Sequence, residues 1–306
     1  MSYHLPVMAH QCIEQLQINP AGVYVDVTFG GGGHSQLILA QLGPQGRLVA
    51  FDQDPDAHAN LPEDERLLFA PANFRHLKRY LRLYGIAEVD GILADLGVSS
   101  HQLDVPERGF SFRFNADLDM RMNPGEGPTA AEILAHTPAD ELQFVLGTYG
   151  EVRNARTLAL RIVEAREVQP IETIGELLQI IEPLARGKTN RYLAQVFQAL
   201  RIAVNDEMGA LKEMLEQATE VLKPGGRLVA MSYHSLEDRL VKNVLKTGQA
   251  SGEAIKDFYG HIYRPYDVLT KKPLEADAAE TAANPRARSA KLRVGERTIA
   301  QPPTEK

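Results

Sequence analysis

The sequence predicts an α/β fold, a doubly wound parallel sheet with helices on both faces, into which an all-helical domain is inserted. From residue 22 to residue 95, short apolar segments rich in β-branched residues alternate with segments whose apolar residues recur at helical spacing. This alternation is typical of strand–helix units whose strands pair in parallel. Between residues 105 and 189 the periodicity is helical without a convincing strand, and after residue 190 the alternation returns.

The first strand–helix unit carries the most distinctive turn of the chain. A strand is predicted over 22–28, and it continues directly into Phe29-Gly30-Gly31-Gly32-Gly33-His34-Ser35. A helix over 36–42 follows and is stopped by a Gly-Pro pair. A second strand over 47–51 ends at Asp52. The pattern predicts a glycine-rich turn between a strand and a helix.

The same order of elements repeats further along the chain. A short strand near 67–69 precedes a basic helix over 74–84, and a strand of the buried type over 89–94 ends at Asp95.

The insertion divides the chain into one domain of residues 1–104 and 190–306 and a second of residues 105–189. It opens with a loop-like stretch over 105–128. The other elements predicted in chain order are helices over 138–147, 150–167 and 172–185, a long helix over 194–222, a strand over 227–231, a helix opening within 232–239, a surface loop over 271–287, a strand over 289–294 and a disordered tail from Gln301.

Composition excludes several classes of protein. The chain has 306 residues, and no apolar run approaches the roughly 20 residues that a membrane-spanning helix needs. Its single cysteine, Cys12, excludes a disulfide framework and a multi-cysteine zinc or iron–sulfur centre, and we predict no metal site. We expect a cytoplasmic protein that does not contact a membrane; the composition leaves monomer and homodimer open.

The net charge of the chain does not describe how its charged residues are distributed. The 33 Lys+Arg and 40 Asp+Glu residues give a net charge of −7, which argues weakly against a nucleic-acid-binding protein. Basic residues nevertheless gather in three groups, a distribution that favours a surface following phosphates over a merely solvated helix face. The groups are Arg75, Lys78, Arg79 and Arg82; Arg153, Arg156, Arg161, Arg166, Arg186, Lys188 and Arg191; and Arg286, Arg288, Lys291, Arg293 and Arg297.

The glycine turn and Asp52 together indicate a nucleoside ligand. Glycines let a ligand approach the backbone closely, and the start of the following helix offers free N–H groups to an anionic group. Asp52 stands at the tip of the next strand, where an acid can accept both ribose hydroxyls. The dinucleotide fingerprint is only partly met, because Ser35 stands at its third glycine position. NAD and S-adenosylmethionine both fit this pattern.

Asp95 distinguishes the two ligands. It ends a central strand and begins Asp95-Leu96-Gly97-Val98-Ser99-Ser100, so its side chain is expected in the crevice where cofactor and substrate react. An enzyme that methylates an amine needs an acid or amide there to hold that amine, whereas a dehydrogenase does not. Alternatively, Asp95 caps a turn.

Seven ordered motifs carry a resemblance to one family. The chain resembles the bacterial 16S ribosomal RNA (cytosine-N(4))-methyltransferases over residues 4 to about 297. The resemblance implies a Rossmann-like class I methyltransferase domain with a helical insertion, the cofactor S-adenosylmethionine, and a cytosine amine in the decoding region of 16S ribosomal RNA, in the small ribosomal subunit, as substrate. The motifs are Thr28 to Ser35, Asp95 to Ser100, Arg108-Gly109-Phe110-Ser111-Phe112, Leu118-Asp119-Met120-Arg121-Met122, Phe197-Gln198-Ala199-Leu200-Arg201-Ile202, Ser232-Tyr233-His234-Ser235-Leu236-Glu237-Asp238-Arg239 and Asn284-Pro285-Arg286-Ala287-Arg288-Ser289.

The resemblance also implies cofactor contacts. Backbone N–H groups of the glycine turn would meet the methionine carboxylate, and Phe74 would stack on the adenine. The implied cofactor residues are Gly32, Gly33, His34, Asp52, Phe74, Asp95 and Gln102.

Catalysis is assigned first to Asp95, which would position the amine, and second to His234 and Ser232 at the end of the fifth strand. Ser235 is as consistent with a helix cap as with a function. Phe110 and Phe112 could stack on a flipped target base or pack in a core.

The chain departs from the family pattern at three places. Gly31 stands where a larger residue is usual, which affects the flexibility of the turn more than its chemistry. Asn123 stands where a second acid is common, and Arg191-Tyr192-Leu193 occupies part of a run that often contains an RNA-contacting arginine. Two rival functions remain, an NAD-dependent oxidoreductase and a non-catalytic RNA-binding assembly factor.

Overall fold

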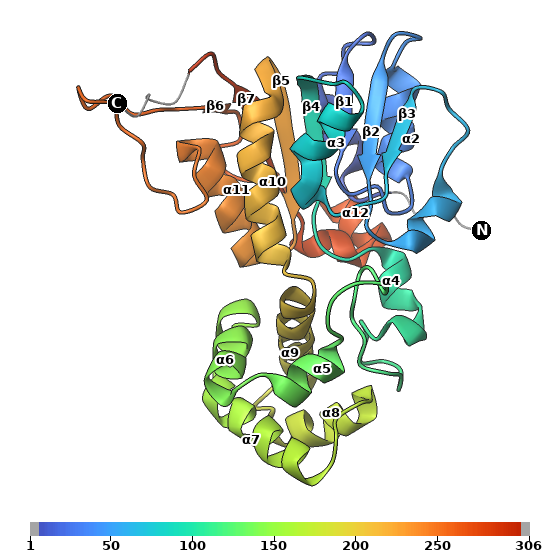
Figure 1. Cartoon of the computed structure of the whole chain (residues 1–306), viewed down its shortest axis with the longest axis vertical. Helices are drawn as coiled ribbons and strands as arrows, with labels where there is room; N and C mark the ends of the chain where they lie inside the picture. The colour runs from blue at the N-terminus through green and yellow to red at the C-terminus, as the bar shows by residue number, and fades with distance from the viewer. Residues whose placement is uncertain (1–5, 301–306) are drawn as a thin grey trace. The chain divides into compact units, whose positions relative to one another are not determined.

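The computed structural model describes residues 6–300, which form two compact units (Figure 1). The first unit comprises the chain up to Gly97 and from Met208 onward, and the second comprises Val98–Glu207. The second unit covers more of the sequence than the predicted insertion of 105–189. The role of that insertion in RNA recognition stays a prediction. The predicted disordered tail from Gln301 lies outside the described residues.

The first unit is built on one seven-stranded sheet with the order β3-β2-β1-β4-β5-β7-β6. The strands from β3 to β5 pair in parallel, whereas β7 runs antiparallel to both of its neighbours. The predicted α/β sheet is therefore confirmed, with an antiparallel edge that the sequence pattern did not indicate. The strands are β1 (Val23–Asp26), β2 (Arg47–Phe51), β3 (Leu67–Ala70), β4 (Val89–Asp95), β5 (Leu222–Ser232), β6 (Tyr266–Val268) and β7 (Lys291–Arg297).

Both faces of this sheet are buried, as the alternation of side chains along β4 and β5 shows. Ile92 and Leu228 point into one apolar cluster, with α3 and α10. Leu93 and Val229, their next neighbours in sequence, point into the opposite cluster with α1 and α2. Figure 1 shows α3 and α10 in front of the sheet. The helices are α1 (Ala9–Leu16), α2 (Gly33–Gln41), α3 (Leu77–Leu83), α10 (Glu207–Val221), α11 (Ser235–Thr247) and α12 (Ala278–Ala283).

The second unit is helical, with its own apolar core. Its core side chains come from all the helices except the short α4, and from the loop around Leu118 and Met120. The predicted helical segments are confirmed, and α5 lies in a stretch for which no element was predicted. The helices are α4 (Ser100–Asp104), α5 (Ala130–His136), α6 (Ala139–Phe144), α7 (Ala155–Val168), α8 (Ile174–Ile181) and α9 (Thr189–Val204).

Two predicted elements are wrong. The long helix over 194–222 is two helices, α9 and α10, because Asn205 ends the first and Asp206 has φ +44, which no α-helix continues through. Part of the predicted surface loop over 271–287 is α12, whose N-terminus is capped by Asp277. Within residues 6–300, no helix is long and apolar enough to cross a membrane.

Candidate active site

The glycine turn joins β1 to α2 at the carboxyl end of the sheet. Gly30 and Gly32 have φ +52 and φ +77, the left-handed region that favours glycine. A Cβ on Gly32 would lie 2.9 Å from Cζ of Phe29, and a Cβ on Gly33 would lie 3.0 Å from Pro6. Gly32 is the N-cap of α2 and supplies no capping side chain, so the first N–H groups of the helix are free to meet an anionic group. A Cβ on Gly31 would meet nothing within 4 Å, which leaves open space beside the turn.

Asp52 is tied to this turn from the end of β2. Its Oδ2 accepts a hydrogen bond of 2.7 Å from Gly30 N, and its Oδ1 accepts one of 2.8 Å from Asp54 N. Burial raises the pKa of Asp52 to about 6, against the lowering effect of these two N–H donors; the nearby charges of Asp54 and Asp26 add to the rise. The carboxylate is therefore fixed in place while its charge is only partly compensated. Such a group gains from hydroxyl donors on a ligand.

Asp95 lies at the end of β4 in a cluster of polar side chains. Its Oδ1 accepts a hydrogen bond of 2.7 Å from the hydroxyl of Tyr233, and its Oδ2 lies 3.7 Å from Nδ1 of His34. Its backbone N–H donates to Oγ1 of Thr28 at 2.7 Å. The side chain of Asp95 is 24% exposed, so one edge of the carboxylate stays accessible.

Burial is the main cause that raises the pKa of Asp95 to about 6. The neighbouring His34 and the hydrogen bond from Tyr233 lower it, while the charges of Asp26 and Glu237 raise it further. The same burial and the charge of Asp95 raise the pKa of Tyr233, so the tyrosine is a hydrogen-bond donor at any physiological pH. Asp95 is then mostly ionised at neutral pH and accepts the tyrosine proton.

The orientation of His34 follows from its two neighbours. Nε2 lies 3.1 Å from the carbonyl oxygen of Val7, which can only accept, so this nitrogen is the donor in that contact. Nδ1 lies 3.7 Å from Oδ2 of Asp95. His34, which is 5% exposed, is therefore held between Val7 and Asp95 at one side of the site.

Asp26 is a site residue that the sequence interpretation missed. It ends β1, is 1% exposed, and accepts hydrogen bonds from Ser35 Oγ at 2.7 Å and Thr28 N at 3.0 Å. Burial raises its pKa. Through Thr28, Asp26 connects the glycine turn to Asp95. The sequence interpretation missed Asp26 because the predicted strand over 22–28 ran two residues past it, whereas β1 ends at Asp26 itself.

His234 and Ser232 lie at the end of β5, but their contacts are structural. His234, not Ser235, is the N-cap of α11: its Nδ1 accepts from Glu237 N at 3.5 Å, and Glu237 accepts from the N–H of Tyr233 at 2.8 Å. The predicted cap at Ser235 is wrong by one residue. Nε2 of His234 lies 3.1 Å from Oε1 of Glu237 without hydrogen-bond geometry. Ser232 is 2% exposed and donates a long bond of 3.4 Å to Lys291 O, so a catalytic role for either residue stays a prediction.

The remaining predicted cofactor residues lie on different units. Phe74 begins a short 3-10 helix, Phe74–His76, and packs against the apolar cluster under α3. Asn73 caps this helix and donates from Nδ2 to Oε1 of Gln53 at 2.9 Å. Gln102 belongs to the second unit, where it forms a capping box with Ser99 at the start of α4. The cofactor roles of Phe74 and Gln102 stay predictions.

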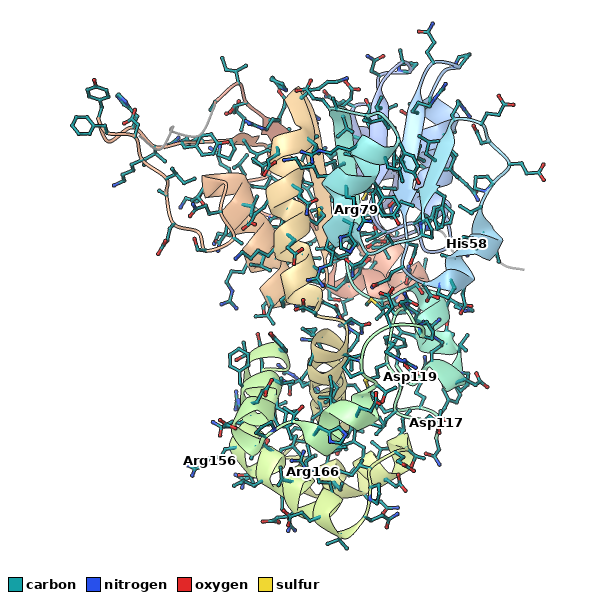
Figure 2. The ribbon with its side chains drawn as sticks, in the orientation of Figure 1. His58, Arg79, Asp117, Asp119, Arg156 and Arg166 are labelled. Carbon is teal, nitrogen blue, oxygen red and sulfur yellow. The ribbon has the colours of Figure 1, made fainter. Side chains whose placement is uncertain are left out.

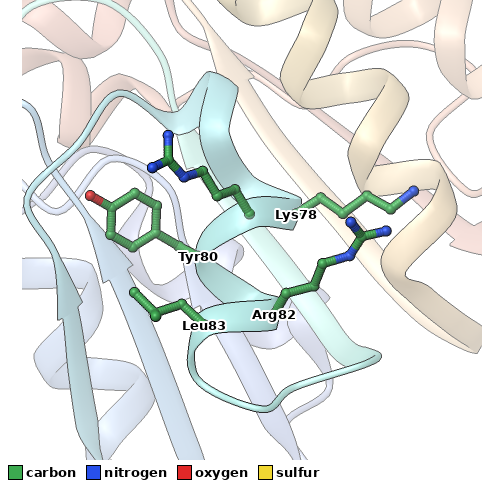
Figure 3. Close-up of a pocket in the computed structure, with 5 residues that line it drawn as sticks. Lys78, Tyr80, Arg82 and Leu83 are labelled. Atoms are coloured by element: carbon green, nitrogen blue, oxygen red, sulfur yellow. The ribbon is translucent and has the colours of Figure 1, made fainter.

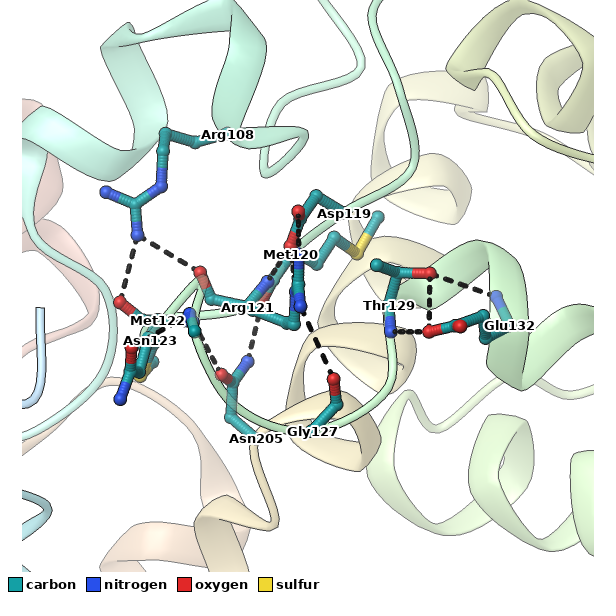
Figure 4. Close-up of polar contacts among 11 residues, drawn as sticks. Arg108, Asp119, Met120, Arg121, Met122, Asn123, Gly127, Thr129, Glu132 and Asn205 are labelled. Atoms are coloured by element: carbon teal, nitrogen blue, oxygen red, sulfur yellow. Dashed lines mark hydrogen bonds and ion pairs between the residues drawn. The ribbon is translucent and has the colours of Figure 1, made fainter.

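The family motifs around residues 108–122 form a tightly held loop in the second unit, not an open one (Figure 4). Arg108 donates to the carbonyls of Arg121 and Met122, each at 3.0 Å. Arg121 forms a two-point ion pair with Asp119; burial acts to raise the pKa of Asp119, but these bonds hold it below its usual range. Met120 is fully buried with φ +62, a conformation that costs free energy in a residue other than glycine.

The packing of this loop determines whether its phenylalanine rings are accessible to a base. Phe110 is 6% exposed and belongs to the apolar core, so it offers no face for a flipped base. Phe112 packs edge-on against Phe197 at 5.4 Å between ring centroids. The proposed stacking role is therefore wrong for Phe110. Asn123, which replaces the common acid, accepts from Gly125 N at 3.0 Å and stabilises the next turn.

The basic segment formed by the 3-10 helix Phe74–His76 and α3 is partly neutralised. Arg75 pairs with Glu213 at 2.9 Å, and Lys78 pairs with Glu220, both on α10. Arg79 and Arg82 are exposed, and among the described residues they have no ion-pair partner. Figure 3 shows a shallow pocket beside α3. The residues that line it are Lys78, Arg79, Tyr80, Arg82 and Leu83.

Comparison with known proteins places this architecture in a family. The model of the MraW methylase family matches residues 1–298. The chain belongs to the MraW methylase family. Membership identifies the Rossmann-like sheet as a class I methyltransferase fold and sets the oxidoreductase reading aside.

Two relatives of known sequence agree with this assignment. The chain is 54% identical over 297 residues to "Ribosomal RNA small subunit methyltransferase H" of Bacteroides fragilis strain YCH46, covering 97% of this chain and 98% of the relative. It is 54% identical over 298 residues to the protein of the same name from Bacteroides thetaiotaomicron, with the same coverage. Among solved structures, an rRNA methylase from Streptococcus thermophilus aligns with a TM-score of 0.41 and 13% identity, covering 97% of this chain and 99% of that one.

Proposed function

We propose that this chain is an S-adenosylmethionine-dependent methyltransferase that modifies the exocyclic N4 amine of a cytosine in the decoding region of small-subunit ribosomal RNA. The observation that supports this proposal most directly is the position of Asp95. This residue ends the central strand β4, and one oxygen of its carboxylate accepts a hydrogen bond from Tyr233. The names of the relatives support the RNA substrate. The cytosine amine follows from the motif resemblance and from the acid at this position.

The residues of the first unit fit the cofactor. The free N–H groups at the start of α2 can donate hydrogen bonds to a carboxylate, and the open space beside Gly31 leaves room for the ligand. The two-oxygen carboxylate of Asp52 suits the hydroxyl pair of a ribose. Gly32, Gly33, His34, Asp52 and Phe74 would hold the cofactor from this unit. When bound, S-adenosylmethionine supplies a methyl carbon on a positively charged sulfur.

Asp95 addresses the main difficulty of the reaction. The lone pair of a cytosine amine is delocalised into the ring, so the amine needs orientation and an acceptor for its proton as positive charge develops. Oδ1 of Asp95 is fixed by Tyr233, which leaves Oδ2 to accept from the amine. Because the pKa of Asp95 is about 6, the group is ionised at neutral pH and can take up the proton that the amine loses.

A labelled-methyl assay tests the function. The purified protein is incubated with S-adenosylmethionine carrying a tritiated methyl group and with small ribosomal subunits or their RNA, and the labelled nucleotide is mapped. We expect label at N4 of a cytosine and a fall in turnover of about 100-fold or more for Asp95→Asn. Asp267→Asn, an exposed acid on β6, is the matched control and should keep wild-type turnover.

Three outcomes would contradict the proposal. Label on a different base or on protein would overturn the substrate. RNA binding without any transfer would identify a non-catalytic binding factor. Wild-type turnover by Asp95→Asn would remove Asp95 from the mechanism.

A further inference from the structure

We infer that one face of the second unit, where α7 and α9 begin, is a binding surface for the phosphate backbone of RNA. The inference rests on the proposed function and names a surface that the family motifs do not include. We call it the α7/α9 basic surface. Its members are Arg153, Arg156, Arg186, Lys188 and Arg191.

These cations differ from every other arginine of the second unit in having no partner. Within Val98–Glu207, the others donate to acids or to backbone carbonyls: Arg161 pairs with Glu164 at 3.1 Å, Arg166 donates to Thr137 O at 2.8 Å, and Arg201 pairs with Glu207 at 2.7 Å. Arg108, Arg113 and Arg121 are likewise bonded. The members of the α7/α9 basic surface are all exposed and, within the described chain, make no ion pair or side-chain hydrogen bond.

The fold brings the two halves of this surface together. The side chain of Asn154, between Arg153 and the start of α7, donates from Nδ2 to the carbonyl oxygen of Leu184 at 3.4 Å. Leu184 lies two residues before Arg186 in the segment that leads into α9. This bond joins two backbone segments, about thirty positions apart in sequence, that carry the cations. Figure 2 shows Arg156 pointing outward from the second unit, away from Arg166 on the same helix.

The backbone adds positive charge at the same place. Asn154 is the N-cap residue of α7 and Lys188 that of α9, and neither side chain accepts from its own helix. Asn is a favoured capping residue, but here its amide holds Leu184 instead. Both helices thus present uncapped N–H groups and the positive ends of their dipoles beside the cations.

A polyanion is the ligand that this arrangement fits. Unpaired like charges held close together repel one another, and a series of phosphates relieves that repulsion at several points at once. The nearest acids along the chain, Glu151 and Glu182, are exposed, and neither forms an ion pair with a member of the α7/α9 basic surface. Since the proposed substrate is RNA, its backbone is the occupant to which we commit.

The test compares charge-removing variants of the full-length protein. The first is the triple variant Arg186→Gln/Lys188→Gln/Arg191→Gln, and the second is Arg153→Gln/Arg156→Gln. Arg161→Gln is the matched control, since it removes an exposed cation from the same helix α7 that Glu164 already neutralises. Affinity for a decoding-region fragment of small-subunit RNA is measured at about 0.15 M salt, where one lost phosphate contact costs roughly fourfold. The triple variant should lose about 50-fold, and the control should lose less than twofold.

Further measurements separate this inference from the proposed function. Calorimetric affinity for S-adenosylmethionine and circular dichroism should be unchanged in all variants, and the loss in methyl transfer should appear as a higher KM for RNA at constant kcat. If the wild type methylates RNA and the triple variant binds it equally well, the surface is wrong and the function stands. An equal loss in Arg161→Gln would also overturn the surface, because the effect would then be one of total charge. A wild type that neither binds nor methylates RNA would refute the proposed function itself.

Discussion

Asp52 and Asp95 are half-buried carboxylates; burial raises the pKa of each to about 6, and their neighbours differ. Backbone N–H groups hold Asp52, so its free electron pairs face a ligand with hydroxyl donors. Tyr233 and His34 flank Asp95, at the position where the reacting groups are expected. Because the two acids titrate in the same pH range, cofactor affinity reports on Asp52 and turnover reports on Asp95.

Cofactor affinity should fall at low pH because of Asp52. Two ribose hydroxyls favour the carboxylate, so binding lowers a pKa that is about 6 in the free protein. The affinity for the cofactor is therefore highest at pH values well above 6. It falls by up to about tenfold per pH unit as the pH drops below that value. Calorimetry with S-adenosylmethionine between pH 5 and 8 measures this directly.

The variant Asp52→Asn is the control for that titration. It should bind more weakly at pH 8 and lose the pH dependence. An affinity for the wild type that is level from pH 8 to pH 5 would remove Asp52 from the cofactor site.

At the scale of elements, the loop that carries the family motifs of the second unit is set by one glycine. Gly109 has φ +73, and a Cβ there would lie 2.6 Å from the carbonyl oxygen of Asp117 and 2.9 Å from the N–H of Asp119. Both contacts are backbone, so neither can move without displacing the Asp119–Arg121 ion pair. We expect Gly109→Ala to destabilise the protein by about 3 kcal/mol or more.

Gly127→Ala isolates the effect of the close contacts. Gly127 has φ +75, almost the same conformation, and a Cβ there would meet nothing within 4 Å. Its substitution should cost only about 1 kcal/mol, the strain of the left-handed backbone. Urea unfolding of the two variants gives the comparison, and equal losses would show that backbone strain alone explains the requirement for glycine.

The elements that were predicted correctly are those whose signal is local. Strands with both faces buried, such as β4, are continuous apolar runs, and the glycine turn follows directly from composition. The break between α9 and α10 was missed because apolar spacing continues through Asn205 and Asp206, and a positive φ at Asp206 leaves no mark in the sequence. The antiparallel direction of β7 also depends on tertiary pairing.

The same distinction applies to the candidate site. Asp52 and Asp95 could be predicted because each ends a strand. The bond from Tyr233 to Asp95 joins β5 to β4 across 138 positions of sequence, so no local pattern contains it. His234 was assigned to chemistry because it follows the end of a predicted strand, and only the backbone at Glu237 shows that it caps α11.

For the whole molecule, the net charge of −7 is a sum that includes many cations already bound to acids or to backbone carbonyls. In the C-terminal basic group, Arg293 pairs with Asp238 at 2.6 Å, and Arg297 donates to the carbonyls of Thr219 and Pro265. These residues hold β7 in the sheet and are unavailable to phosphates. Within Val98–Glu207, the cations that the fold leaves without a partner are those of the α7/α9 basic surface.

The salt dependence of RNA binding should therefore be modest. Counterion release contributes a slope of about −0.7 per phosphate contact with single-stranded nucleic acid, so five contacts give a slope of log affinity against log salt near −3.5. Shape and a few placed cations then decide binding more than bulk attraction does, as expected for an acidic protein. Affinity for the RNA fragment measured from about 0.05 to 0.4 M salt gives the slope. A value steeper than about −7 would require twice as many contacts as this surface offers, and would mean that Arg79 and Arg82 on α3 or the third basic group also meet the RNA.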